Sequence, residues 1–245
     1  MTDAIGYETD FGVISLSTKD LLEIPKAHRD FLLSASLIAN DMKFHLSIMV
    51  RSPIDSENDD VRSMQMIRWL WASRKIASII IEAYDTINVF IGKIESLKML
   101  SKGEHPVLSK ANKASKFIAV AREFRNKSAY HYDHTNLDAG LSDFDENAQH
   151  RIFVHKQVGN SISELAEQIH TIPTLKRISG SSNFDGFNTW CIECSRTIIQ
   201  FCNAATAEII LANFPNRIHD MKAISIINEA EPQKHRWPLF WVNQT

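Results

Sequence analysis

The clearest evidence for the fold class lies in residues 61–97, which read VRSMQMIRWLWASRKIASIIIEAYDTINVFIGKIESL. Its apolar positions alternate spacings of three and four, as in the seam of a coiled-coil helix. These positions are Met66, Trp69, Ser73, Ile76, Ile80, Ala83, Ile87, Phe90, Ile94 and Leu97. A second strip beside the seam holds Ile67, Leu70, Ile81, Tyr84 and Ile91. Because a helix that is apolar on two sides must be covered on both, we expect this helix at the centre of a bundle.

Two other segments show helical spacing around this centre. Ser17 and Asp20 have the spacing of a capping box, and Pro25 fits the first turn of a helix from about Lys26 to Val50. Its inward positions would be Phe31, Ser34, Ile38, His45 and Ile48. A third helix is expected from about Lys110 to Tyr130. Its inward positions would be Phe117, Val120, Ala121, Phe124 and Ser128.

The remaining segments are less regular. Residues 1–16 look irregular or locally extended. Residues 151–158 alternate loosely, which fits either a small hairpin across Gly159-Asn160 or simple extended chain. A short helix is expected at 162–169, and a long one at 185–214 that ends at Pro215. The aromatic tail at 237–241 is expected to dock on the body or on a partner chain.

The composition favours one all-α (mainly α) domain. With 245 residues and 44% hydrophobic content, the chain has enough apolar surface for a sizeable core in a single helical domain over residues 1–245. Its 8 glycines and 7 prolines are few for a sheet protein with many tight turns. We therefore expect a helical bundle.

Charge, cysteine usage and hydropathy narrow the protein's class. A net charge of −2 excludes general coating of nucleic acid but permits a local basic site. Three cysteines form no disulfide framework, which indicates a reducing compartment. Residues 1–12 lack a signal-peptide pattern, and no apolar stretch approaches the roughly 20 residues that span a bilayer. We expect a cytoplasmic protein with no membrane partner.

The chemistry-bearing residues gather in RNKSAYHYDH, residues 125–134. Arginine can hold a phosphate through its planar fork of donors, and histidine can move protons near neutral pH. The preceding segment, 110–127, contains six basic residues and one acid. Its expected RNA contacts are Lys113, Lys116, Arg122 and Lys127. A plain solvated surface fits this spread of charges equally well.

Other catalytic patterns lack support. Cys191 and Cys194 have the spacing of a redox or zinc motif, but they lie in an expected helix with no second cysteine pair, so buried structural cysteines are favoured. The chain has no phosphate-binding loop, nucleophile elbow or zinc-protease motif. We expect no cofactor and no metal.

The segment from Arg125 to His131 resembles the HEPN family of helical domains, many of which are ribonucleases of toxin–antitoxin and phage-defence systems. The family's motif is an arginine, usually followed by a polar residue, and then a histidine after four to six residues. Here Asn126 follows Arg125, and five residues separate Arg125 from His131. The resemblance covers about 26–135 and leaves 160–245 as an accessory helical layer.

This resemblance implies metal-independent RNA cleavage, a homodimer that brings two motifs together, and a cognate antitoxin. It assigns phosphate binding to Arg125 and proton transfer to His131, with Asn126 in support. Tyr130, Tyr132 and His134 are expected to orient substrate or stack on an unpaired base. In one unbroken helix, Arg125 and His131 would stand about 120° apart, so a helix end or a second chain must bring them together.

Two questions stay open from the residues alone. Arg74, Ser78, Asp85 and Asn88 interrupt the second strip of the 61–97 segment, and they form either a solvent-facing polar strip or a support for the Arg/His motif. The motif itself belongs either to a ribonuclease or to a catalytically silent interaction protein. In the second case, Arg125 would be satisfied by an acid such as Glu123 or Asp133.

Overall fold

The computed structural model describes residues 7–51, 57–127, 140–148, 151–153, 162–180, 183–219 and 222–228, and its fold is mainly helical, as predicted. The helices are α1 (Thr18–Glu23), α2 (Lys26–Arg51), α3 (Asp59–Ile91), α4 (Glu95–Lys102), α5 (Lys110–Ala114), α6 (Phe117–Lys127), α8 (Glu164–Ser179), α9 (Phe184–Asn213) and α10 (Pro215–His219). The strands are β1 (Tyr7–Val13), β2 (Ile152–Phe153), β3 (Ile162–Ser163) and β4 (Lys222–Asn228).

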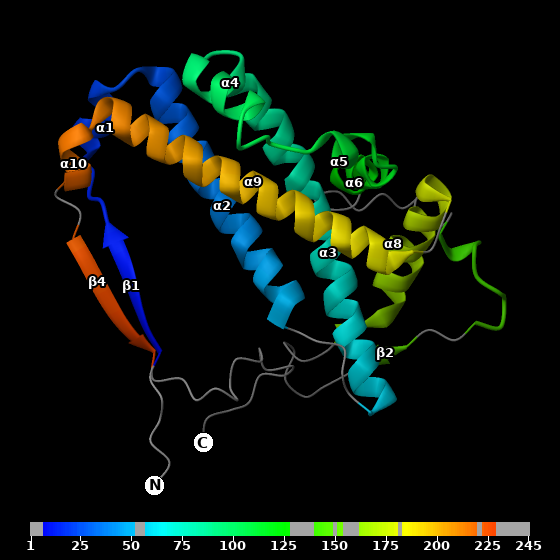
Figure 1. The fold of residues 1–245 in the computed structure, drawn as a ribbon. Coiled ribbons are helices and arrows are strands. Elements are labelled where there is room, and N and C mark those ends of the chain that lie inside the picture. Colours follow the sequence, from blue (N-terminus) through cyan, green and yellow to red (C-terminus); the bar gives the residue numbers. More distant parts are fainter. Residues whose placement is uncertain are drawn as a thin grey trace, which may run out of the picture.

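Helix α3 is the centre of the bundle, as its two apolar strips predicted. It packs against α2, α6, α8 and α9 (Figure 1). From both strips, the fully or nearly fully buried residues of α3 include Ile67, Leu70, Ile76, Ile80, Ile81, Ala83 and Ile87. A helix that loses most of its apolar surface to four neighbours anchors the other elements.

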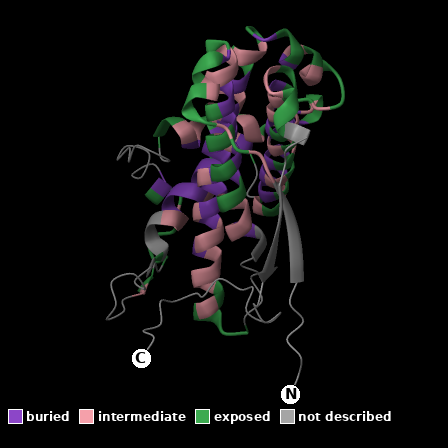
Figure 2. Cartoon of the chain, turned by 90° about the vertical axis from the view of Figure 1, so that its left-hand side faces the viewer, coloured by how far each residue is buried: buried purple, intermediate pink, exposed green. Residues whose placement is uncertain are grey.

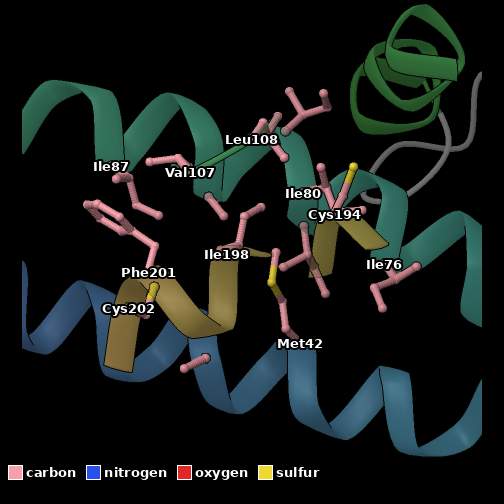
Figure 3. Close-up of a cluster of buried hydrophobic side chains, with 14 of the residues drawn as sticks. Met42, Ile76, Ile80, Ile87, Val107, Leu108, Cys194, Ile198, Phe201 and Cys202 are labelled. Carbon is pink, nitrogen blue, oxygen red and sulfur yellow. The ribbon is translucent and has the colours of Figure 1, made fainter. Parts of the chain in front are cut away.

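The main core lies between α2, α3 and α9. Ile76, Ile80 and Ile87 of α3 face Ile198 and Phe201 of α9 (Figure 3). Met42 of α2 and the connection between α4 and α5 add to the same cluster. Across the described residues, burial follows the facing sides of the long helices (Figure 2). The core therefore joins segments from most of the described sequence.

The predicted helix of residues 61–97 is wrong at its C-terminal end, where the chain breaks into α3 and α4. Gly92 caps α3, and Ile94 takes an extended conformation with φ −124° and ψ 110° before α4 begins. Glycine has low helix propensity, so the helix stops here at little cost. Ile94 and Leu97 still reach the core, which is why the apolar spacing continued across the break.

The predicted helix of residues 110–130 is also interrupted. Ser115 separates α5 from α6 with an extended backbone, φ −65° and ψ 138°. Its hydroxyl accepts a hydrogen bond from the Phe117 amide at 3.2 Å. Serine competes with helix formation through such local bonds. The inward face of α6 was predicted correctly at Val120, Ala121 and Phe124, all buried; Ser128 lies outside the described residues.

Helix α2 has the predicted bounds within one residue but a different core face. The capping box of Ser17 and Asp20 is present and begins the short helix α1 before it. The buried residues of α2 are Phe31, Leu32, Ala35, Ala39, Met42 and Met49. Of the predicted face, Phe31 is buried, whereas Ser34, Ile38, His45 and Ile48 are half-buried. The buried face differs from the predicted one because α2 packs against both α3 and α9. A single apolar stripe in the sequence does not indicate that a helix has two packing partners.

Helix α8 is longer than the predicted helix of residues 162–169, but Ile162 and Ser163 form the strand β3 instead of its first turn. α8 continues through Pro173 to Ser179, and Gly180 ends it with φ 67°. β2 pairs antiparallel with β3, in agreement with the hairpin alternative. β1 pairs antiparallel with β4 and forms a ribbon at one side of the helices (Figure 1). The aromatic tail at 237–241 lies outside the described residues.

Candidate functional site at the end of helix α6

The described part of the motif lies in the last turn of α6. Arg125, Asn126 and Lys127 are the last three residues of this helix, and Asn126 and Lys127 are exposed. Tyr130, His131, Tyr132 and His134 lie outside the described residues. The structure therefore places the expected phosphate-binding group of the motif, while the assignment of the proton-transfer group stays a prediction.

Two carboxylates of the central helix hold Arg125. Its Nε donates to Glu82 Oε1 at 2.5 Å, and its Nη1 lies 3.8 Å from Asp85 Oδ2. The side chain of Arg125 remains 34% exposed, so the guanidinium stands at the edge of the bundle. The hydrogen bond to Glu82 is the main cause that raises the pKa of Arg125 above its ordinary value. The guanidinium is therefore charged and oriented by its contacts with α3.

The polar residues along α3 divide between two environments. Asp85 faces the motif, as the second interpretation of the polar strip proposed. Arg74 and Ser78 are buried, so the solvent-facing interpretation is wrong for these two. Asn88 is exposed. Glu82 was not among the predicted site residues, although its spacing of three from Asp85 places both carboxylates on one side of a helix.

Glu123, one of the two acids considered for Arg125, pairs with other residues. Its carboxylate lies 3.0 Å from Lys127 Nζ and 3.5 Å from Arg177 Nη2. Asp133, the other acid, lies outside the described residues. The carboxylates that meet Arg125 thus come from another helix, which the order of the sequence did not indicate.

The predicted RNA contacts lie on α5, on α6 and, for Lys116, on the short connection between them. Lys113 Nζ lies 5.4 Å from the centre of the Tyr84 ring, and Lys116 Nζ lies 5.9 Å from that of the Phe117 ring. Arg122 is exposed, and Lys127 is paired with Glu123. Lysine near an aromatic ring is a favourable cation–π arrangement. This surface is basic but partly neutralised.

A buried ion pair also links α3 to α8. Arg74 Nη2 donates to Glu167 Oε1 at 2.5 Å, with side-chain exposures of 9% and 13%. Thr171 Oγ1 also donates to Glu167, at 3.0 Å. A buried ion pair of this kind is tolerated because each charge lies next to an opposite charge and also makes hydrogen bonds. The pair is one of the contacts that join α8 to the central helix.

The three cysteines are structural, as predicted for Cys191 and Cys194. All three are free thiols buried in α9. Burial raises the pKa of the Cys194 and Cys202 thiols to about 12, and it raises that of Cys191 well above its usual value. A thiol that stays protonated is a poor nucleophile and metal ligand.

Among the residues that the structure describes, no group of three or more histidine, cysteine or acidic side chains could hold a metal ion. None of the described helices has the length and apolar character needed to cross a membrane.

Comparison with protein-family models, curated protein sequences and solved structures yields no match.

Proposed function

We propose that this chain is a HEPN-like, metal-independent RNA endonuclease of a toxin–antitoxin or phage-defence system. The observation that supports it best is the orientation of Arg125 by Glu82 and Asp85, because a partly exposed guanidinium at a helix end is suited to meet a phosphate. The motif histidine, His131, follows six positions further along the chain.

In the proposed reaction, the ribose 2′-oxygen attacks phosphorus and the bond to the 5′-oxygen breaks. The 2′-hydroxyl loses a proton, the leaving 5′-oxygen gains one, and the products carry a 2′,3′-cyclic phosphate and a 5′-hydroxyl. His131 takes the first proton or supplies the second, and Arg125 stabilises the charge on the phosphorane. Asn126 supports the pair, and a second copy of the chain completes the site near a twofold axis.

The test is RNA cleavage in the presence of a chelator. Purified full-length protein is incubated with mixed single-stranded RNAs and with DNA of the same sequences. We expect RNA products that end in 2′,3′-cyclic phosphate, no cleavage of DNA, and loss of activity in Arg125→Ala and in His131→Ala. Circular dichroism should show that both variants keep the helical fold.

Expression in growing cells provides a second readout. The wild-type chain should arrest growth, and His131→Ala should relieve the arrest. Cleavage that continues at the wild-type rate in both variants would indicate a different site or a contaminant. If cells expressing the wild-type chain grow as well as cells expressing His131→Ala, and no RNA is cleaved in vitro, the toxin proposal is wrong.

A second candidate function, a self-associating interaction module, is favoured by the outer side of α2. Leu33, Leu37 and Phe44 are 52%, 67% and 50% exposed. They lie within roughly 40° of one another around the helix. In an antiparallel pair of α2 helices, Leu33 of one copy would stand opposite Phe44 of the other. We propose a second copy of the chain as the occupant of this surface.

A charged residue introduced on α2 tests whether this helix forms the contact between two copies, and whether RNA cleavage depends on that contact. Leu37→Glu should abolish self-association measured by analytical ultracentrifugation if α2 forms the contact. Leu22→Glu, at another exposed leucine, is the matched control because that side chain lies in α1. If both variants associate like the wild type, α2 is not the interface. RNA cleavage by the Leu37→Glu variant would show that the ribonuclease does not need this contact.

A further inference from the structure

We propose that Glu82 and Asp85 form an electrostatic latch on Arg125, and that an RNA phosphate binds this arginine only by displacing one of the two carboxylates. The inference rests on the proposed function, because it concerns regulation of the same guanidinium. The latch is inferred from the guanidinium nitrogens of Arg125 that already contact a carboxylate.

A guanidinium can bind a phosphate with two donors along either of two edges. The side edge presents Nε and Nη2, and the end edge presents Nη1 and Nη2. Glu82 Oε1 engages Nε at 2.5 Å, and Asp85 Oδ2 stands 3.8 Å from Nη1. One donor of each edge therefore faces a carboxylate. A phosphate that takes both donors of an edge must move that carboxylate away.

The charge of the cluster opposes the same event. One guanidinium and two carboxylates carry a formal charge of −1, so a phosphodiester approaching the closed cluster is repelled. The three side chains are between 34% and 45% exposed, and ion pairs at such exposure are weak enough to open in water. The latch is therefore closed in the structure and can be opened by a ligand.

The class of ligand can be inferred from the free energy needed to displace a carboxylate from Arg125. Inorganic phosphate is small and reaches only the cluster around Arg125, so no further contact offsets the loss of the carboxylate contact. A single-stranded RNA can also meet exposed lysines such as Lys113 and Lys116, and those contacts offset the loss. The latch thus selects a polyanionic chain over a free anion.

The test measures binding of a mixed-sequence 12-nucleotide 2′-O-methyl RNA, which lacks the nucleophilic hydroxyl and stays intact. Glu82→Gln keeps a neutral acceptor but removes the charge. We expect this variant to bind the RNA about two- to five-fold more tightly than the wild type, the range that matches a weak exposed ion pair. Asp85→Asn should give a smaller gain, because its contact is longer. Inorganic phosphate should not compete with the RNA for the wild-type chain.

A general effect of charge must be separated from the latch. Glu123→Gln removes the same charge from α6, where its carboxylate pairs with Lys127 and Arg177 rather than Arg125. Each variant is also made with Arg125→Ala. With a latch, the gain from Glu82→Gln disappears in the Arg125→Ala background, whereas any gain from Glu123→Gln remains. A gain from Glu82→Gln that persists without Arg125 would overturn the latch.

The remaining outcomes separate the latch from the proposed function. If Arg125→Ala weakens RNA binding but Glu82→Gln weakens it too, Glu82 positions Arg125 for RNA and the latch alone fails. If no variant binds RNA, the proposed function fails and the latch fails with it. If only Glu82→Gln binds measurably, the latch is supported and holds the wild-type chain closed. Thermal unfolding followed by circular dichroism checks that each variant is folded.

Discussion

Arg125 at the end of α6 and Glu82 in the middle of α3 form an ion pair between residues 43 positions apart, with 2.5 Å between Nε and Oε1. The pair joins the motif to the central helix of the bundle. It also places the motif arginine where solvent reaches it, since 34% of its side chain stays exposed. The same contact thus orients the arginine and competes for it.

This pair should contribute little to the free energy of unfolding. In a double-mutant cycle of Glu82→Gln and Arg125→Ala, we expect a coupling of about 0.2–1 kcal/mol, because water screens a half-exposed pair. Urea unfolding followed by circular dichroism measures it. A coupling well above this range would mean that the pair supports the fold and that Arg125 is less available to a ligand than the latch requires.

The buried pair of Arg74 and Glu167 should behave differently. Glu167→Ala leaves the Arg74 charge inside the protein without that carboxylate, and we expect a loss of about 3–5 kcal/mol. Urea unfolding is again the measurement. Arg217→Ala is the control, because it breaks an exposed pair with Asp20 and should change stability by less than about 1 kcal/mol. Equal effects of the two substitutions would contradict the burial of the pair.

Truncation in α3 should distinguish its core side from its outer side. Ile80→Ala removes a fully buried side chain between α3 and α9 and should cost about 2–5 kcal/mol (Figure 3). Val89→Ala, on the same helix, removes a side chain that is 53% exposed and should stay within about 0.5 kcal/mol. Similar losses at both positions would argue against the central placement of α3.

The cysteines give a pH prediction. Because burial raises the pKa of Cys194 and Cys202 to about 12, the folded chain keeps these protons while the unfolded chain loses them near pH 9. An acid whose pKa is raised by folding stabilises the folded state below its unfolded pKa, and this contribution declines as pH rises through and above about 9. Stability measured by urea unfolding should therefore fall from pH 8 to pH 10.

Alkylation tests the same burial by another route. A thiol-specific reagent at pH 8 should leave Cys191, Cys194 and Cys202 unmodified in the folded chain and label all three in urea. Mass spectrometry counts the modified thiols. Cys202→Ser is a useful comparison, because it should leave two protected thiols. Rapid labelling of the native chain would show that α9 opens or is not buried as described.

Local spacing accounts for most of what could be predicted of the fold. The two strips of residues 61–97 indicated a central helix, and the capping box at Ser17 and Asp20 is present. Such patterns are readable because they depend on residues within one or two turns. The breaks at Gly92 and Ser115 were missed because apolar residues continue in helical spacing on both sides of each break.

Local sequence patterns were enough to predict that the chain forms helices, that α3 is covered on two sides, and that an arginine stands near the end of a helix. The packing of the helices, by contrast, brings Glu82 and Asp85 to that arginine and brings Glu167 to Arg74, 93 positions away in the sequence. Spacing along a helix specifies which residues share a side. The partner of that side depends on how the helices pack against one another, and this is set by the whole core.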